Sequence, residues 1–124
     1  MVILDTNILI DHLRLSEKEE SLFNRLVKEN PHEIFAISLV TVQELYEGKS
    51  TKREKEEMRM LKLLDDCKIL PYTYEVASIA GKIARDASCQ LELPDAAIAA
   101  TALIHESQLF TLNTKDFEKI PELT

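Results

Sequence analysis

The sequence predicts an α/β fold in which a parallel sheet carries helices on both faces. Short apolar segments alternate with segments of helical periodicity, an order typical of parallel strands joined by helices. Only two glycines and four prolines occur, so little of the chain is suited to flexible linkers. With 124 residues, 45% of them hydrophobic, the chain is expected to form a single domain, residues 1–124, around its own core.

Four short apolar segments are predicted to be strands. Val2, Ile3 and Leu4 form the first, because β-branched and apolar residues in a short run favour a buried strand. The other predicted strands are residues 35–38, 68–72 and 109–112. Asp5 then follows the first strand directly, at the sheet edge where ligands bind in open α/β folds.

Helical spacing of apolar residues predicts the elements between these strands. A first helix follows Asp5, with Asp5 itself, Thr6 or Asn7 as its cap. Further helices are predicted over residues 16–30, 39–48, 50–67, 74–90 and 91–107, with a short helix or loop over 113–120. Ser16, followed by Glu19, is expected to cap the second helix. Gly81 predicts close packing of the helix that contains it.

The charge balance and the cysteines limit the function classes. Fifteen Lys and Arg against twenty-two Asp and Glu give a net charge of −7, which disfavours unselective binding to nucleic acid or to an anionic membrane. Two cysteines, Cys67 and Cys89, form neither a zinc motif nor a disulfide framework. No stretch has membrane-spanning length, so the expected protein is soluble and cytoplasmic.

Acidic residues recur near the ends of the predicted elements. Asp5 ends the first strand, Glu44 lies on the helix after the second, Asp95 opens an alanine-rich helix, and Asp116 follows the fourth strand. Each has a simple structural explanation when taken alone, as a helix cap, a dipole partner or an exposed residue. Parallel strands, however, bring several of them to one edge, where they would repel one another.

Clustered carboxylates favour a hard divalent cation, and Mg²⁺ or Mn²⁺ is therefore the expected cofactor. Such a cation can activate a water molecule and neutralise the charge that develops on a phosphate. Hydrolysis of a phosphodiester bond suits this site, because the cation and not a basic surface would attract the substrate.

Four segments in order carry a resemblance to a known family. The segments ILDTNILID, TVQELYEG, LPDAAIAA and LFTLNTKDF resemble the PIN-domain family, and specifically the VapC-type toxins of prokaryotic toxin–antitoxin pairs. The similarity runs from residue 2 to about residue 118. It implies a PIN-like three-layer α/β/α sandwich with a short, mainly parallel central sheet of four to five strands.

The resemblance also implies an activity and a set of site residues. The expected activity is that of a magnesium- or manganese-dependent endoribonuclease. Asp5, Glu44 and Asp95 match the family's metal ligands, and Asp116 matches an acid of its last motif. The supporting polar positions that the resemblance implies are Asn7, Thr111 and Asn113. Asn113 stands where other members carry an aspartate, so either Asn113 or Asp116 completes the site.

Partners follow from the same resemblance. The family implies an RNA substrate, a homodimer and a cognate antitoxin that blocks the acidic site, often with an arginine. An acidic site would attract a guanidinium group on charge grounds alone. The chain ends at PELT, which leaves a fifth strand truncated, very short or absent.

Two other classes of protein remain as alternatives. A phosphate-receiving regulatory domain also gathers acids around Mg²⁺, but Asp5 is not preceded by an acidic pair and Lys115 is poorly placed for that role. A dimeric binding module with a vestigial site is the second alternative. The presence of Asp5, Glu44 and Asp95 argues against it. Metal-dependent cleavage discriminates between this binding module and a ribonuclease.

Overall fold

The computed structural model confirms the α/β prediction. It describes residues 1–16, 18–87 and 91–117, apart from the side chain of Asp116. The strands are β1 (Val2–Leu4), β2 (Phe35–Ser38), β3 (Lys68–Leu70) and β4 (Gln108–Phe110). The helices are α1 (Thr6–Arg14), α2 (Leu22–Glu29), α3 (Leu39–Glu47), η1 (Lys49–Lys52, a 3₁₀ helix), α4 (Glu54–Leu64), α5 (Tyr74–Asp86), α6 (Leu93–Ile104) and α7 (Thr114–Phe117).

The four strands form one parallel sheet in the order β3-β2-β1-β4. Ile3 lies beside Ala36 and Leu109, which places β1 in the interior of the sheet. Because all the strands run in the same direction, the residues that follow β1, β2 and β4 emerge at one carboxyl edge. The possible fifth strand falls in residues 118–124, outside the described residues.

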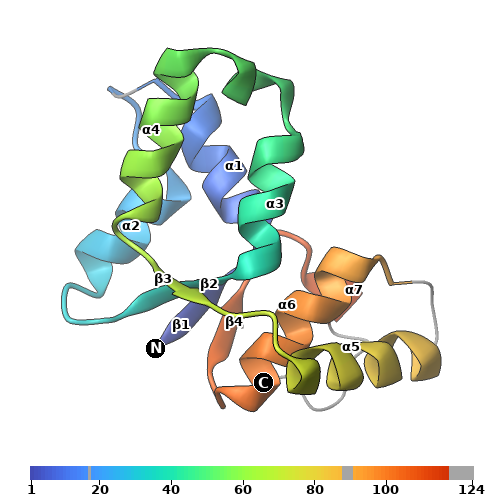
Figure 1. Ribbon diagram of the computed structural model, residues 1–124. Helices are drawn as coiled ribbons and strands as arrows, with labels where there is room; N and C mark the ends of the chain where they lie inside the picture. Colours follow the sequence, from blue (N-terminus) through green and yellow to red (C-terminus); the bar gives the residue numbers. More distant parts are fainter. Residues whose placement is uncertain (17, 88–90, 118–124) are drawn as a thin grey trace.

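Helices cover both faces of the sheet, as the three-layer prediction requires (Figure 1). Alternate side chains of a strand point to opposite faces, so Leu4 joins one core and Ile3 the other. The first core lies under α1, α2, α3 and α4. The second lies mainly under α6, whose buried alanines allow it to approach the sheet closely. Helix α5 packs outside α6.

The second helix begins later than predicted. Ser21, not Ser16, is the N-cap of α2, and its hydroxyl accepts the Asn24 N–H at 3.1 Å. Asp11 adds a second cap by accepting the Leu22 N–H at 3.2 Å. Ser16 and Glu19 do bond to each other, but they form only a turn before the helix. Tertiary contacts with α1 therefore select the start of α2.

Other predicted boundaries need smaller corrections. The segment 50–67 is not one helix, because η1 and α4 are separated at Arg53. The fourth strand ends at Phe110, so Thr111 lies just beyond it.

The prediction of close packing at Gly81 was wrong, since a Cβ built there would meet no atom within 4 Å. None of the described helices has the length and apolar character that crossing a membrane requires.

Candidate active site

Asp5 lies at the junction of β1 and α1 and is only 4% exposed. One carboxylate oxygen accepts the Thr6 backbone N–H at 2.7 Å, so Asp5 is the N-cap of α1, and Thr6 is the first helical residue. The other oxygen accepts the Thr111 hydroxyl at 2.6 Å. Asp5 is therefore the cap of α1, and its second oxygen is held by the residue that follows β4.

Thr6 connects Asp5 to Glu44. The Thr6 hydroxyl donates to Glu44 Oε1 at 2.6 Å, and it lies 2.9 Å from the hydroxyl of Thr41, which is fully buried on α3. Since the single Thr6 hydroxyl proton goes to Glu44, the Thr41 hydroxyl donates to Thr6. Thr6 thus orients one acid through its backbone and the second through its side chain.

Glu44 is half-buried and lies near other acidic residues. Burial raises the pKa of Glu44 above its ordinary value, and the hydrogen bond from Thr6 counteracts part of this rise. The nearby charges of Asp5, Glu47 and Glu92 raise the pKa further. The three acids repel the ionised form of Glu44, which is the electrostatic pattern expected where carboxylates gather.

Asp95 reaches the same edge through helix α6. This helix leads into the parallel strand β4, so it runs against the strand direction and begins at the carboxyl edge of the sheet. Asp95 is half-buried in its first turn, where an acid is favoured by the helix dipole. Helix α6 also packs against α3, which carries Glu44. Glu92, the N-cap of α6, is close enough to affect the pKa of Glu44.

The predicted supporting residues form a small hydrogen-bond network beside Asp5. Asn7 Nδ2 donates to the Thr111 hydroxyl at 3.4 Å, and Asn7 Oδ1 accepts the Leu112 N–H at 3.3 Å. Asn113 contributes its backbone N–H, which donates to the Thr111 hydroxyl at 2.9 Å, while its side chain is exposed. The backbone of Asp116 lies in α7, and its side chain is outside the described part of the structure.

Sequence reasoning missed Thr6 and Thr41 as parts of this site. Thr6 was considered only as a helix cap, although it directly follows the acid at the strand end. Thr41 precedes Glu44 by three positions on one helix, a spacing that places two side chains on the same face. Neither signal identifies the contact between Thr6 and Glu44, because that contact joins residues 38 positions apart.

Comparison with known proteins settles the family. Residues 2–123 match the family described as PIN domain. This chain belongs to the PIN-domain family. Over 99% of its length the PIN domain is 32% identical to Ribonuclease VapC10 and to Ribonuclease VapC19 of Mycobacterium tuberculosis, covering 90% and 97% of those proteins. The resemblance to VapC-type toxins is confirmed. The PIN domain replaces the alternative of a phosphate-receiving regulatory domain.

Solved structures resemble this PIN domain over nearly its whole length. A toxin–antitoxin complex from Klebsiella pneumoniae has a chain with 32% identity and a TM-score of 0.77, with coverage of 100% of this chain and 96% of that one. VapBC from Salmonella typhimurium, bound to DNA, gives 26% identity and a TM-score of 0.82, with coverage of 98% and 93%. The PIN-like sandwich is therefore confirmed.

The acids in the described part of this PIN domain do not form a closed cage. Among the described residues, no three carboxylate, imidazole or thiol groups are arranged to hold a metal ion. What the structure brings together is a pair of acids, Asp5 and Glu44, joined through Thr6 at the start of α1.

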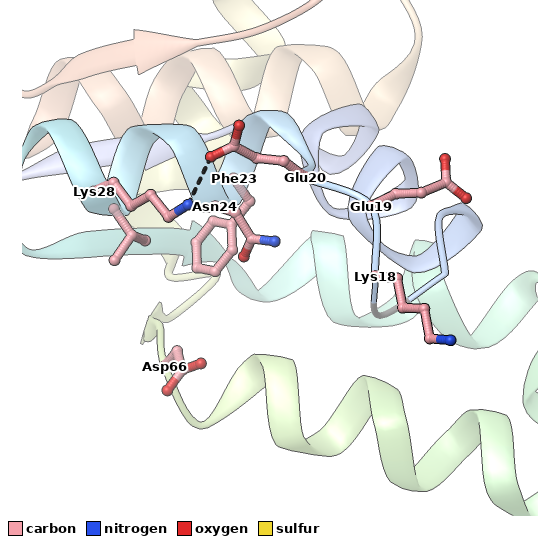
Figure 2. Close-up of a pocket in the computed structure, with 8 residues that line it drawn as sticks. Lys18, Glu19, Glu20, Phe23, Asn24, Lys28 and Asp66 are labelled. Atoms are coloured by element: carbon pink, nitrogen blue, oxygen red, sulfur yellow. Dashed lines mark hydrogen bonds and ion pairs between the residues drawn. The ribbon is translucent and has the colours of Figure 1, made fainter.

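A cavity of about 580 Å³ lies apart from this edge, between α2 and the end of α4 (Figure 2). Phe23 and Asp66 face it from opposite sides, and the Lys28 ammonium bonds Glu20 at 2.9 Å on its border. None of the predicted site residues is part of its lining. The candidate active site is thus defined by its polar network and not by this cavity.

Proposed function

We propose that this PIN domain is a divalent-metal-dependent endoribonuclease that acts as the toxin of a VapBC-type toxin–antitoxin pair. The observation that carries the proposal is the pair Asp5 and Glu44, held together by Thr6 at the carboxyl edge of the sheet. Both relatives are named ribonucleases, and each matches 99% of this chain. Their names support the same reaction. The substrate bond is an RNA phosphodiester.

The chemistry of the donor set fits Mg²⁺ or Mn²⁺. Asp5, Glu44 and Asp95 would supply the hard oxygen ligands that these cations prefer. Mg²⁺ commonly binds through one or two carboxylates and retains several waters, so a closed cage of three acids is not required. A cation would also offset the negative charges that, after burial, raise the pKa of Glu44. When bound, it would lower the pKa of a water and offset negative charge on the phosphate.

The residues around the acids act by positioning them. Thr111 and the Thr6 N–H fix the two oxygens of Asp5, and the Thr6 hydroxyl fixes Glu44. Asn7 holds Thr111 in place from α1. In this proposal Asp116 supports the three ligands, water is the nucleophile, and the pre-set orientation of the acids lowers the cost of reaching the productive geometry.

We also propose a cognate antitoxin, a second copy of the chain and a cytoplasmic location. The antitoxin follows from the similar solved structures, which are described as toxin–antitoxin complexes. An acidic edge suits an inhibitory arginine. Leu39 and Tyr72, which follow the paired strands β2 and β3, are 45% and 40% exposed, and Tyr74 is 91% exposed, so this end of the sheet offers apolar surface to a second copy.

Cleavage of a panel of labelled single-stranded RNAs tests the proposed function. We expect cutting with Mn²⁺ or Mg²⁺ and none with EDTA. Asp95→Asn should reduce the rate by more than about a hundredfold, because loss of a ligand costs at least as much as loss of its supporting group. The matched control is Asp86→Asn, on the exposed end of α5. Equal rates in the wild type and Asp95→Asn would refute the proposed site.

Absence of cutting with every RNA and metal would favour the alternative of a binding module with a vestigial site. Cleavage that persists in EDTA would refute the metal dependence and leave only the ribonuclease activity.

A further inference from the structure

A second cavity, of about 430 Å³, opens directly beside Glu44. It lies among α1, α3, η1 and α4, where η1 joins the end of α3 to the start of α4 (Figure 1). Its volume falls in the range of small-ligand sites, roughly 300–1,000 Å³. Because Glu44 belongs both to this cavity and to the proposed active site, a molecule in the cavity is next to the acids.

Two arginines line this cavity. Arg14 is the last residue of α1, and Arg53 precedes α4. Within the described residues neither guanidinium takes part in an ion pair or a side-chain hydrogen bond, in contrast to Arg59, which donates to three backbone carbonyls. Glu56 also lines the cavity. In a chain of net charge −7, two available guanidinium groups beside an acidic site are suited to a phosphate group.

The rest of the lining is suited to the ribose and base of a nucleotide. Its apolar residues come from three helices and are Ile10, Leu13, Leu45 and Met60. Ser50 of η1 completes one wall and has an exposed side chain. Proteins bind single-stranded RNA by stacking its bases on aromatic or guanidinium planes while cations contact its phosphates. This cavity offers two guanidinium groups for these contacts, next to an apolar floor that can bury a base.

We propose that this cavity is a subsite for the nucleotide adjacent to the cleaved bond of a single-stranded RNA. Arg14 and Arg53 would contact its phosphate, and the apolar floor would receive its base. The inference rests on the proposed ribonuclease function, because Glu44 links the two sites. It adds a cationic element to a site whose identified residues are otherwise acidic or neutral.

Binding of a fluorescein-labelled single-stranded RNA of mixed sequence, followed by anisotropy in EDTA, tests the subsite without cleavage. The double variant Arg14→Ala/Arg53→Ala should bind about tenfold more weakly. The slope of log K against log salt should become shallower by about 0.7 for each phosphate that the variant no longer neutralises. The control is Lys55→Ala/Lys62→Ala, which removes the same charge from an exposed face of α4. Equal weakening in the two double variants would refute a specific subsite.

A second variant tests the cavity itself. Ser50→Phe places a ring in the cavity without a change of charge, so it should also weaken RNA binding, while circular dichroism confirms that the fold is kept. In cleavage assays, the RNA concentration at half-maximal rate should rise for Arg14→Ala/Arg53→Ala. Unchanged RNA binding in these variants would refute the subsite and leave the cavity to a protein partner.

The outcomes separate the subsite from the proposed function. RNA binding that depends on Arg14 and Arg53, with no cleavage under any metal, would refute the nuclease and the place of this cavity beside a cleaved bond, and would leave the cavity as an RNA-binding site only. Metal-dependent cleavage with arginine-independent RNA binding would refute the subsite and support the nuclease.

Discussion

The two ends of helix α1 are built in opposite ways. At the amino end, Asp5 and Glu44 approach the same residue, Thr6, and their mutual repulsion contributes to the raised pKa of Glu44. At the carboxyl end, Arg59 of α4 donates to the backbone carbonyls of Leu13 and Leu15 at 2.9 and 2.6 Å, and more weakly to that of His12 at 3.3 Å.

The difference contrasts a proposed active site with a contact that stabilises the fold. A helix dipole favours one acid at its amino end and a cation at its carboxyl end, so Asp5 and Arg59 both obey this rule. Glu44 departs from it, because a second, half-buried acid beside Asp5 adds negative charge at the same helix end. Such local conflicts are expected where a sequence serves a function.

The largest expected effect on stability is at the carboxyl end. Arg59→Ala removes three charge-assisted hydrogen bonds from half-buried carbonyls and should lower the free energy of unfolding by about 2–3 kcal/mol. Urea denaturation measures this change. Arg25→Ala, an exposed arginine on α2, is the control and should stay within about 0.5 kcal/mol. Similar destabilisation by both would show that Arg59 does not hold the end of α1.

A smaller effect is expected from the positioning network at the amino end. Thr111→Val removes the hydroxyl that donates to Asp5 Oδ2 and should lower the rate of RNA cleavage about tenfold while the protein stays folded. Thr114→Val, an exposed threonine at the start of α7, is the control. If both variants cleave at the same rate, Thr111 has no part in positioning Asp5.

The smallest predicted effects concern pH and have opposite signs at the two ends. Burial, followed by the charge of Arg59, lowers the pKa of His12 from 6.5, so the unfolded chain binds more protons and stability falls as the pH drops below about 6.5. Burial raises the pKa of Glu44 from 4.5, so its ionisation reduces stability as the pH rises above about 4.5. Each effect should stay below about 1 kcal/mol because both groups are partly exposed.

Denaturation of His12→Gln and Glu44→Gln across this pH range, in EDTA, measures both effects. His12→Gln should lose less stability than the wild type on acidification. Glu44→Gln should be more stable than the wild type at neutral pH and lose that advantage near pH 4.5. Reversed signs in either variant would contradict the stated causes.

Much of the fold and the acidic edge could be predicted, because both depend on the order in which strands and helices follow one another along the chain. Parallel strands joined by helices place Asp5 and the start of α3 at the same edge, whatever the details of packing. The start of α2 could not be predicted, because it depends on Asp11 bonding the Leu22 N–H across two helices. The bond from Thr6 to Glu44 escaped prediction for the same reason, since local spacing contains no information on contacts between distant segments.

Titration of the protein with Mn²⁺ in a calorimeter tests the central claim most directly, since it needs neither an RNA target nor turnover. The wild type should bind Mn²⁺, and Asp5→Asn should bind it at least about tenfold more weakly, while keeping its fold because asparagine also caps helices well. The control is Asp11→Asn. Asp11 also lies on α1 but caps α2, so this variant should bind Mn²⁺ like the wild type. Equal Mn²⁺ affinity in the wild type and Asp5→Asn would contradict a metal site at the amino end of α1.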